Sequence, residues 1–235
     1  MLKELFFHNN FYLTDDAIAK FEIFLKLFKE KNSLINLSSI KDDKSIIEKH
    51  FIDSLMLTKY VDLQGDVADI GTGGGFPLLP LAIYSKYQKN MESLVQYYGI
   101  DSVEKKLKAV DDFSSLLGLS NVETIHSRFE DLGQDKDNRE SFDYVVSRAT
   151  AYFPTLLEYA IPLLKVGGIF IAYKMDNLVE IIDGTRALIS LKSEIVYEKK
   201  YELAGQVRSL VFVRKKEKTP ILYPRSPQII ARKPL

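Results

Sequence analysis

The stretch from Asp66 to Leu81 constrains the fold of this chain more than any other part of the sequence. A short apolar run, Val67 to Ile70, predicts a buried strand, and four glycines follow it within five positions. An apolar, helix-compatible run then extends to Ile83. Glycine accepts positive φ and lets a ligand approach the backbone closely. Strand, glycine turn and helix in this order predict a backbone cradle for a ligand.

The spacing of the glycines indicates which ligand to expect. Gly71, Gly73 and Gly75 form the pattern G-x-G-x-G, and Phe76 stands where the dinucleotide fingerprint G-x-G-x-x-G has its third glycine. An acidic residue, Asp69, precedes the first glycine by two positions. This combination is typical of S-adenosylmethionine (SAM)-dependent methyltransferases. An NAD(P) or flavin site and a purely structural turn are the alternatives. A P-loop is excluded, because no Gly-Lys-Ser/Thr follows.

Composition removes several kinds of chemistry. The 235 residues suffice for one large α/β domain, and 46% hydrophobic with 27% charged residues indicates a globular chain. The absence of cysteine excludes disulfides, cysteine-based zinc sites and iron–sulfur clusters, including those of radical SAM enzymes. It also disfavours carbon-5 pyrimidine methylation, which normally needs a cysteine nucleophile. Three scattered histidines do not suggest a metal site, and we expect none.

The sequence shows no membrane or export signal. No apolar run approaches the roughly 18 residues that a membrane-spanning helix requires. The N-terminus carries an acid early and lacks a small-residue cleavage site, so we expect no signal peptide and a cytoplasmic location.

Charge is distributed unevenly along a chain whose formal net charge is zero. The segment 214–235 has seven Lys and Arg residues against one acid, which gives +6 and leaves −6 on residues 1–213. A basic tail on an acidic body suggests a local anionic partner. The alternative is that the tail is simply a solvated terminus.

The first sixty residues predict a helical extension. Apolar residues recur at helical spacing over 14–30 behind a Thr14 cap, and a second helix is expected over 43–59. His50, Asp53 and Ser54 share one face of the second helix. They could form a catalytic dyad, but we favour a structural role in aligning the extension on the main domain.

The remaining chain alternates strands and helices. Strands are expected at 67–70, 94–100, 122–126, 143–147, 169–174, 194–202 and 206–214, and helices at 102–117, 153–164 and 176–191. Alternation predicts a parallel sheet with right-handed crossovers, and the last two strands form a hairpin. The predicted fold is a class I SAM-dependent methyltransferase: a Rossmann-like α/β fold with a mostly parallel seven-stranded sheet and an antiparallel C-terminal hairpin. The expected domains are 1–62 helical extension, 63–214 SAM-binding domain and 215–235 basic tail.

Further site residues are expected where strands end, because ligands of open α/β sheets bind at the carboxyl ends of the strands. Asp101 ends the second strand, where an acid can accept hydrogen bonds from ribose; capping the next helix is the alternative. The segment 127–131 follows the third strand and could hold adenine. Arg148 ends the fourth strand and could meet a carboxylate or phosphate, or form a structural ion pair. The loop after Ser147 lacks the [DNS]-P-P-[YFW] sequence of enzymes that methylate exocyclic amines.

Several motifs together resemble the GidB/RsmG family of methyltransferases over nearly the whole chain. The matching segments are 36–40, His50 with 53–55, 69–77, 101–106, 146–149, the Leu-Leu-Lys-x-Gly-Gly run ending at Gly168, 223–225 and the terminal Arg-Lys-Pro-Leu. The family methylates N7 of a guanine in small-subunit (16S) ribosomal RNA with SAM. The chain departs from the usual pattern at Leu78, at Phe129 and at Tyr173-Lys174-Met175, where the family has Leu-Lys-Gly, and its segment 86–93 is long and polar.

The resemblance implies that SAM is contacted by Gly71, Phe76, Phe129, Glu130 and Arg148. Guanine N7 has a free lone pair and no proton to lose, so no catalytic base is expected. Arg148 and Lys174 are the candidates for positioning RNA or cofactor. The expected partner is 16S ribosomal RNA or a small-subunit precursor, without a membrane or a metal, and the expected state is a monomer. A SAM-dependent small-molecule methyltransferase and a non-enzymatic RNA-binding assembly factor are the alternatives.

Overall fold

The computed structural model describes residues 1–148, 151–176 and 178–235, which divide into two compact units. The first unit comprises Met1–Gln64 and Thr72–His126, and the second comprises Gly65–Gly71 and Ser127–Leu235. The chain therefore passes from one unit to the other three times, and one of these passages lies inside the glycine turn, between Gly71 and Thr72.

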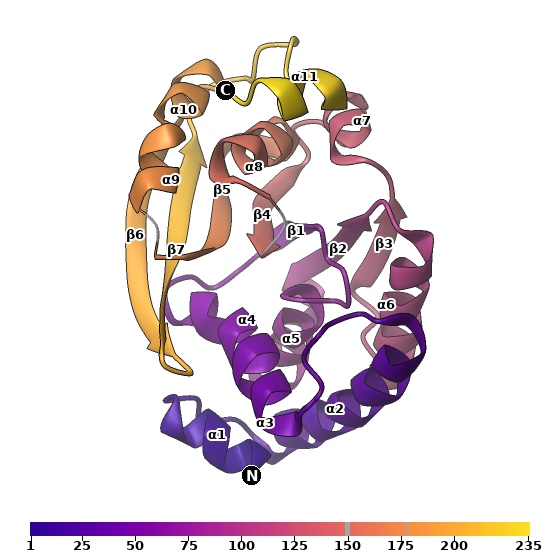
Figure 1. Ribbon diagram of the computed structural model, residues 1–235. Helices are drawn as coiled ribbons and strands as arrows, with labels where there is room; N and C mark the ends of the chain where they lie inside the picture. Colours follow the sequence, from indigo (N-terminus) through magenta and orange to yellow (C-terminus); the bar gives the residue numbers. More distant parts are fainter. Residues whose placement is uncertain (149–150, 177) are drawn as a thin grey trace. The chain divides into compact units, whose positions relative to one another are not determined.

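Long helices dominate the first unit. α2 (Asp15–Ile35) begins where predicted, because the hydroxyl of Thr14 accepts a 3.2 Å hydrogen bond from the N–H of Ala17. α6 (Glu104–Leu117) ends at Gly118, whose φ of +72° suits glycine. Figure 1 shows α2 and α6 side by side. The other helical elements are α1 (Leu2–His8), α3 (Asp43–Ile46), η1 (Ile47–Ile52), α4 (Asp53–Leu55), η2 (Met56–Lys59), α5 (Leu78–Ile83), η3 (Tyr84–Gln88) and η4 (Glu92–Leu94).

Two strands complete the first unit. β2 (Val95–Asp101) and β3 (Val122–His126) pair in parallel, with Ile100 opposite Ile125. The core of the unit is aromatic, because fully buried phenylalanines from α2 and η1 pack on one another and on residues of the glycine turn and α6. These rings are Phe21, Phe24, Phe28, Phe51, Phe76 and Phe113. The expected helices over 14–30 and 43–59 are both confirmed, the second as a continuous helical run from α3 to η2.

The second unit contains five strands in the order β1-β4-β5-β7-β6. β1 (Gly65–Ile70), β4 (Phe142–Arg148) and β5 (Leu164–Met175) run parallel, whereas β7 (Gln206–Lys215) is antiparallel to both β5 and β6 (Ser193–Leu203). α8 (Phe153–Ala160) packs on β4 and β5, and α10 (Thr185–Ser190) packs on β6 (Figure 1). The remaining helical elements are α7 (Phe129–Gln134), η5 (Ile161–Leu163), α9 (Leu178–Asp183) and α11 (Pro227–Arg232).

The described residues thus contain seven strands, mostly parallel and ended by an antiparallel hairpin, which confirms the predicted fold class. Three details of the prediction were wrong. β5 begins at Leu164, whereas the strand was expected to begin at residue 169, after Gly167 and Gly168. The helix expected over 176–191 is two helices, α9 and α10, with Gly184 between them. The tail, whose prolines at 220, 224, 227 and 234 predict an extended path over the surface, contains the short helix α11.

Candidate functional site

The glycine turn adopts the backbone conformation that its sequence predicts. Gly71, Gly73 and Gly75 have φ values of +79°, +56° and +89°, in the left-handed region that other L-residues rarely occupy. Within the first unit, the N–H of Thr72 donates to the carbonyl of Ile100 at 3.1 Å. The N–H of Gly75 donates back to the carbonyl of Thr72 at 2.8 Å. The turn is therefore closed on itself and tied to the carboxyl end of β2.

Asp101 ties the turn to β2 a second time. Its Oδ2 accepts a 3.0 Å hydrogen bond from the N–H of Gly73, and its Oδ1 accepts a 2.9 Å bond from the N–H of Val103. The two roles weighed from the sequence are therefore not exclusive, because one carboxylate oxygen holds the start of α6 and the other holds the glycine turn. A carboxylate has about four acceptor positions, so these contacts leave Asp101 able to accept from ribose hydroxyls.

The donor set of this turn fits the predicted cofactor. Glycine backbone at positive φ exposes N–H groups without side chains in front of them, and a carboxylate stands beside them. The path of the backbone is also fixed by packing. A Cβ on Gly75 would lie 2.5 Å from Cδ1 of Leu79, so no larger residue fits there without a shift. Such a combination suits a nucleoside with an attached charged chain.

Phe76 is placed by the helices of the extension. It is 6% exposed, and its ring stacks on the imidazole of His50 with centroids 4.6 Å apart and planes 16° apart. Nε2 of His50 is in turn 2.8 Å from Oγ of Ser38. The hydroxyl of Ser54 donates to the carbonyl of His50 at 2.5 Å, within the helical run. His50 therefore supports the glycine turn, which is the alignment role that the sequence favoured over a catalytic dyad.

The second unit brings together Phe129, Glu130 and a residue that the sequence did not indicate, Tyr159. The rings of Phe129 and Tyr159 lie 5.3 Å apart, and the hydroxyl of Tyr159 hydrogen-bonds to the buried carboxylate of Glu130. Burial, and after it the negative charge of Glu130, raises the pKa of Tyr159 to about 12. Tyr159 therefore stays protonated and orients Glu130. Its place in α8 carries no local signal, since only the packing of α7 against α8 creates the contact.

Arg148 is the last residue of β4 and lies at the carboxyl end of the second unit's parallel strands. β1 and β4 are in register with Asp69 opposite Val146, so Gly71 and Arg148 leave their strands at the same level. Oγ of Ser147 donates to the carbonyl of Ile70 at 2.9 Å and locks this register. The predicted loop that follows Arg148 includes residues 149–150, which lie outside the described residues.

Lys174 near the end of β5 is committed to a structural contact. It forms an ion pair with Glu180 of α9, and both side chains are 12% exposed. Its Nζ also donates to the carbonyl of Ala151 at 3.1 Å. Glu180 accepts a 2.7 Å bond from the N–H of Phe153, at the start of α8. Lys174 therefore holds together the segments that follow β4 and β5, and any effect on RNA or cofactor would pass through them.

The basic tail is partly built into the second unit. Lys215 is fully buried, with Nζ 2.8 Å from Glu140, and burial lowers its pKa against the raising effect of this ion pair. Arg225 forms a bidentate pair with the fully buried Glu158 at 2.7 and 2.8 Å. Arg139 donates to four backbone carbonyls, those of Gly133, Thr219, Pro220 and Tyr223. Two of the seven basic residues counted in the sequence are therefore structural, and five lie exposed: Arg214, Lys216, Lys218, Arg232 and Lys233.

Two negative findings apply to residues 1–148, 151–176 and 178–235. None of their helices is both long and apolar enough to cross a membrane. No group of three or more His, Cys, Asp or Glu side chains among them could hold a metal ion.

Sequence comparison places the chain among known proteins. A family model described as "GidB: rRNA small subunit methyltransferase G" matches residues 17–210. The ribosomal RNA small subunit methyltransferase G of Desulfitobacterium hafniense (strain Y51) is 41% identical over 230 residues, which cover 96% of this chain and 92% of that protein. The protein of the same name from Desulforamulus reducens is 36% identical over 239 residues, covering 100% and 97%.

Solved structures resemble the chain in fold. A SAM-dependent methyltransferase from Aquifex aeolicus aligns with a TM-score of 0.55 at 17% identity, over 76% of this chain and 97% of that one. A ribosomal protein L11 methylase from Lactobacillus delbrueckii subsp. bulgaricus aligns with a TM-score of 0.53 at 18% identity, over 76% and 81%. At such identities the likeness establishes the class I methyltransferase fold alone.

Proposed function

The chain belongs to the GidB family of small-subunit ribosomal RNA methyltransferases, and we propose that it transfers the methyl group of SAM to N7 of a guanine in 16S ribosomal RNA. The observation that carries this proposal is the glycine turn held by Asp101 through the N–H of Gly73. It supplies a cofactor cradle in a chain that matches an RNA methyltransferase family over most of its length. The match favours RNA over a small molecule as the substrate, and the intact cradle favours an enzyme over a purely structural factor.

The residues of the chain act in this proposal by binding and orientation. When bound, SAM supplies an electrophilic methyl group on its sulfonium sulfur. The turn from Gly71 to Gly75 and the carboxylate of Asp101 hold the nucleoside part, as the sequence pattern implies. Glu130, oriented by Tyr159, supplies a further acceptor, and Arg148 supplies a fixed positive charge at the end of β4. Correct orientation of two reactants alone can contribute several orders of magnitude in rate.

No proton transfer is assigned to a side chain. Guanine N7 carries an in-plane lone pair and no hydrogen, so methylation gives a cationic ring without loss of a proton. His50 contacts the glycine turn, because its ring is stacked on Phe76, and its Nε2 contacts Ser38. These contacts support a structural role for it.

We expect the product to be N7-methylguanosine, and its fixed positive charge provides the test. Borohydride reduction followed by aniline cleaves RNA at this nucleoside. Small-subunit RNA incubated with the enzyme and SAM should gain one cleavage site. The single-turnover rate of methyl transfer should stay nearly flat between about pH 6.5 and 8.5, because a step without a base has no titrating group to follow.

Incorporation of labelled methyl groups without aniline cleavage would exclude N7 as the target. A rate that rises tenfold per pH unit would reveal a general base, with a His50→Ala variant as the first one to measure. Small-subunit RNA that already carries N7-methylguanosine serves as the control, since it should accept no further methyl group.

The exposed cations of the tail are proposed to contact RNA phosphate. We expect Lys→Gln or Arg→Gln changes at positions 216, 218, 232 and 233 to reduce the slope of log K for RNA binding against log salt concentration by about three. Each lost phosphate contact reduces this slope by roughly 0.7–0.9. SAM affinity should be unchanged. Deletion of 215–235 is unsuitable as a test, because it would also remove the buried Lys215 and Arg225.

A matched variant with Lys→Gln changes at the exposed positions 26, 41, 44 and 105 has the same change of net charge. An equal effect of both variants on the salt slope would mean that RNA binding senses only total charge. No effect of the tail variant would mean that the tail is only a structural segment.

The predicted cytoplasmic location and monomeric state remain part of this proposal. A ribosomal RNA substrate in bacteria supports the first. Light scattering of the purified protein, with and without RNA, would measure the second.

A further inference from the structure

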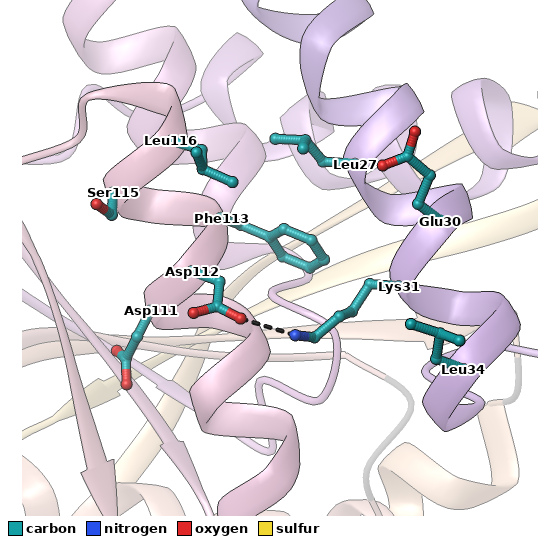
Figure 2. Close-up of a pocket in the computed structure, with 9 residues that line it drawn as sticks. All are labelled: Leu27, Glu30, Lys31, Leu34, Asp111, Asp112, Phe113, Ser115 and Leu116. Atoms are coloured by element: carbon teal, nitrogen blue, oxygen red, sulfur yellow. Dashed lines mark hydrogen bonds and ion pairs between the residues drawn. The ribbon is translucent and has the colours of Figure 1, made fainter.

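A groove lies between α2 and α6, inside the first unit. Its volume is about 530 Å³, and Figure 2 shows Leu27, Phe113 and Leu116 directed into the space between the two helices. Leu34 adds a fourth apolar side chain on the α2 side. Phe113 is 2% exposed, whereas Leu34 and Leu116 are 78% and 62% exposed. The groove thus has a fixed aromatic floor and exposed leucines at its margins.

The floor of the groove is rigid because it belongs to the aromatic core of the unit. The ring of Phe113 lies 5.5 Å from that of Phe24 and 6.5 Å from that of Phe28. Both of these rings also contact Phe76 in the glycine turn, at 5.5 and 5.0 Å. The groove is therefore a preformed feature of the packed core, and a ligand would not need to create it.

The polar lining of the groove is acidic. It contributes Glu30, Asp111 and Asp112 against one cation, Lys31. Nζ of Lys31 is 2.7 Å from Oδ2 of Asp112, so this pair spans the groove and largely cancels, as the dashed line in Figure 2 shows. Glu30 is exposed at the groove, whereas the carboxylate of Asp111 accepts from the hydroxyl of Thr124 at 2.9 and 3.1 Å and points away from α2 in Figure 2. The lining still carries three acids against one cation, so the margin is negative. Such a margin repels phosphate, which disfavours RNA as the occupant.

We propose that this groove docks an amphipathic, Lys- and Arg-bearing helix of a protein in the small ribosomal subunit. An amphipathic helix places apolar residues at helical spacing into an apolar groove, and α2 and α6 present such a groove with leucines on both sides. Proteins that bind RNA neutralise its phosphates with Lys and Arg, so the proteins of a ribosomal particle offer the charge that complements Glu30 and the negative lining of the groove. The inference rests on the proposed function, because the choice of a small-subunit particle as the partner follows from the proposed 16S RNA substrate.

The consequence for substrate choice is that the enzyme would bind two components of one particle, its RNA and one of its proteins. RNA would be bound by the exposed basic residues and the catalytic machinery, and protein by the groove. Loss of the groove should therefore weaken binding to the particle and leave binding to protein-free RNA intact.

The test compares two double variants of the full-length protein. Leu34→Ser with Leu116→Ser removes the two exposed leucines of the groove. Ile23→Ser with Leu94→Ser is the matched control, because both residues are exposed, 43% and 54%, and neither lines the groove. Kd is measured without SAM, by sedimentation with purified small ribosomal subunits that lack the modification and separately with protein-free 16S RNA. We expect the groove variant to bind the subunits at least about tenfold more weakly and RNA normally, and the control to match the wild type.

A second measurement uses a synthetic 15-residue peptide with leucines at helical spacing and lysines elsewhere. It should compete with the subunits for the wild-type protein, whereas the same peptide with glutamates in place of lysines should not. Equal Kd of wild type and groove variant for the subunits would overturn the proposal. So would an equal loss on protein-free RNA, which would place RNA in the groove.

Circular dichroism melting of both variants verifies folding, which exposed substitutions should preserve. Because no SAM is present, these binding results are separate from the aniline assay. A chain that binds subunits through the groove but forms no N7-methylguanosine would refute the proposed reaction and leave the docking site standing.

Discussion

A Gly73→Val variant is expected to lose more than about a hundredfold in SAM affinity while remaining folded. Gly73 has φ of +56°, where a β-branched residue is a conformational outlier and an ordinary L-residue costs about 1–2 kcal/mol. Its N–H is also the one that Asp101 accepts at 3.0 Å. A valine would therefore move the backbone away from this bond and place a side chain in the cradle. Isothermal titration with SAM measures the loss.

The hairpin between β6 and β7 provides a matched control. Gly205 has φ of +71°, and no atom lies within 4 Å of the Cβ that it would gain. A Gly205→Val variant therefore carries similar backbone strain without filling a cradle, and it should bind SAM normally. Wild-type affinity in a folded Gly73→Val protein would remove the turn from the cofactor site. Equal losses in both variants would attribute the effect to general strain.

Removal of Arg225 should destabilise the protein by about 3–5 kcal/mol, the cost of breaking a buried ion pair. Glu158 is fully buried, and Arg225 satisfies it three times, through Nε, a guanidinium N–H and the backbone N–H. An Arg225→Ala variant leaves this carboxylate charged and largely unpaired inside the second unit. The free energy of unfolding in urea measures the effect.

Two comparisons separate this cause from a loss of surface charge. A Lys233→Ala variant removes an exposed cation of the same tail and should change stability by less than about 0.5 kcal/mol. Adding Glu158→Leu to Arg225→Ala should recover part of the loss, because no unpaired charge then remains buried. If Arg225→Ala unfolds at the same urea concentration as the wild type, the tail is not anchored by this pair.

Local patterns predicted the elements that depend on few neighbours. Thr14 caps α2, glycine ends α6 at Gly118, and the hairpin turns at Gly205, because each effect lies within a few residues of sequence. The glycine turn and Asp101 were predicted for the same reason. The bond between Gly73 and Asp101 spans 28 positions, but both residues stand at strand ends that the sequence already placed at one edge.

Tertiary packing determined what the sequence did not show. The helix expected over 176–191 breaks at Gly184, where a Cβ would lie 2.7 Å from the ring of Phe153 in α8. The partner of Glu130, Tyr159, is also in α8 and has no motif around it. The role of Arg225 depends on Glu158, which is 67 positions away and buried. Basic composition alone could not distinguish this arginine from the exposed cations beside it.

The division of the chain between the two units has a consequence for synthesis. Residues of the first unit are complete once His126 has been made, but β1, which leads into the glycine turn, belongs to the second unit. Its parallel partner there is β4, and the bond from Asp66 to Asp143 spans 77 positions. At about 5–20 residues per second, a ribosome needs roughly 4–15 seconds to cover that distance. A nascent chain thus carries Thr72, Gly73 and Asp101 well before the strand that delivers Gly71 can pair with β4. During that interval β1 lacks β4, its partner in the second unit, and the apolar residues of β1 are the ones on which a chaperone or a misfolded contact would act.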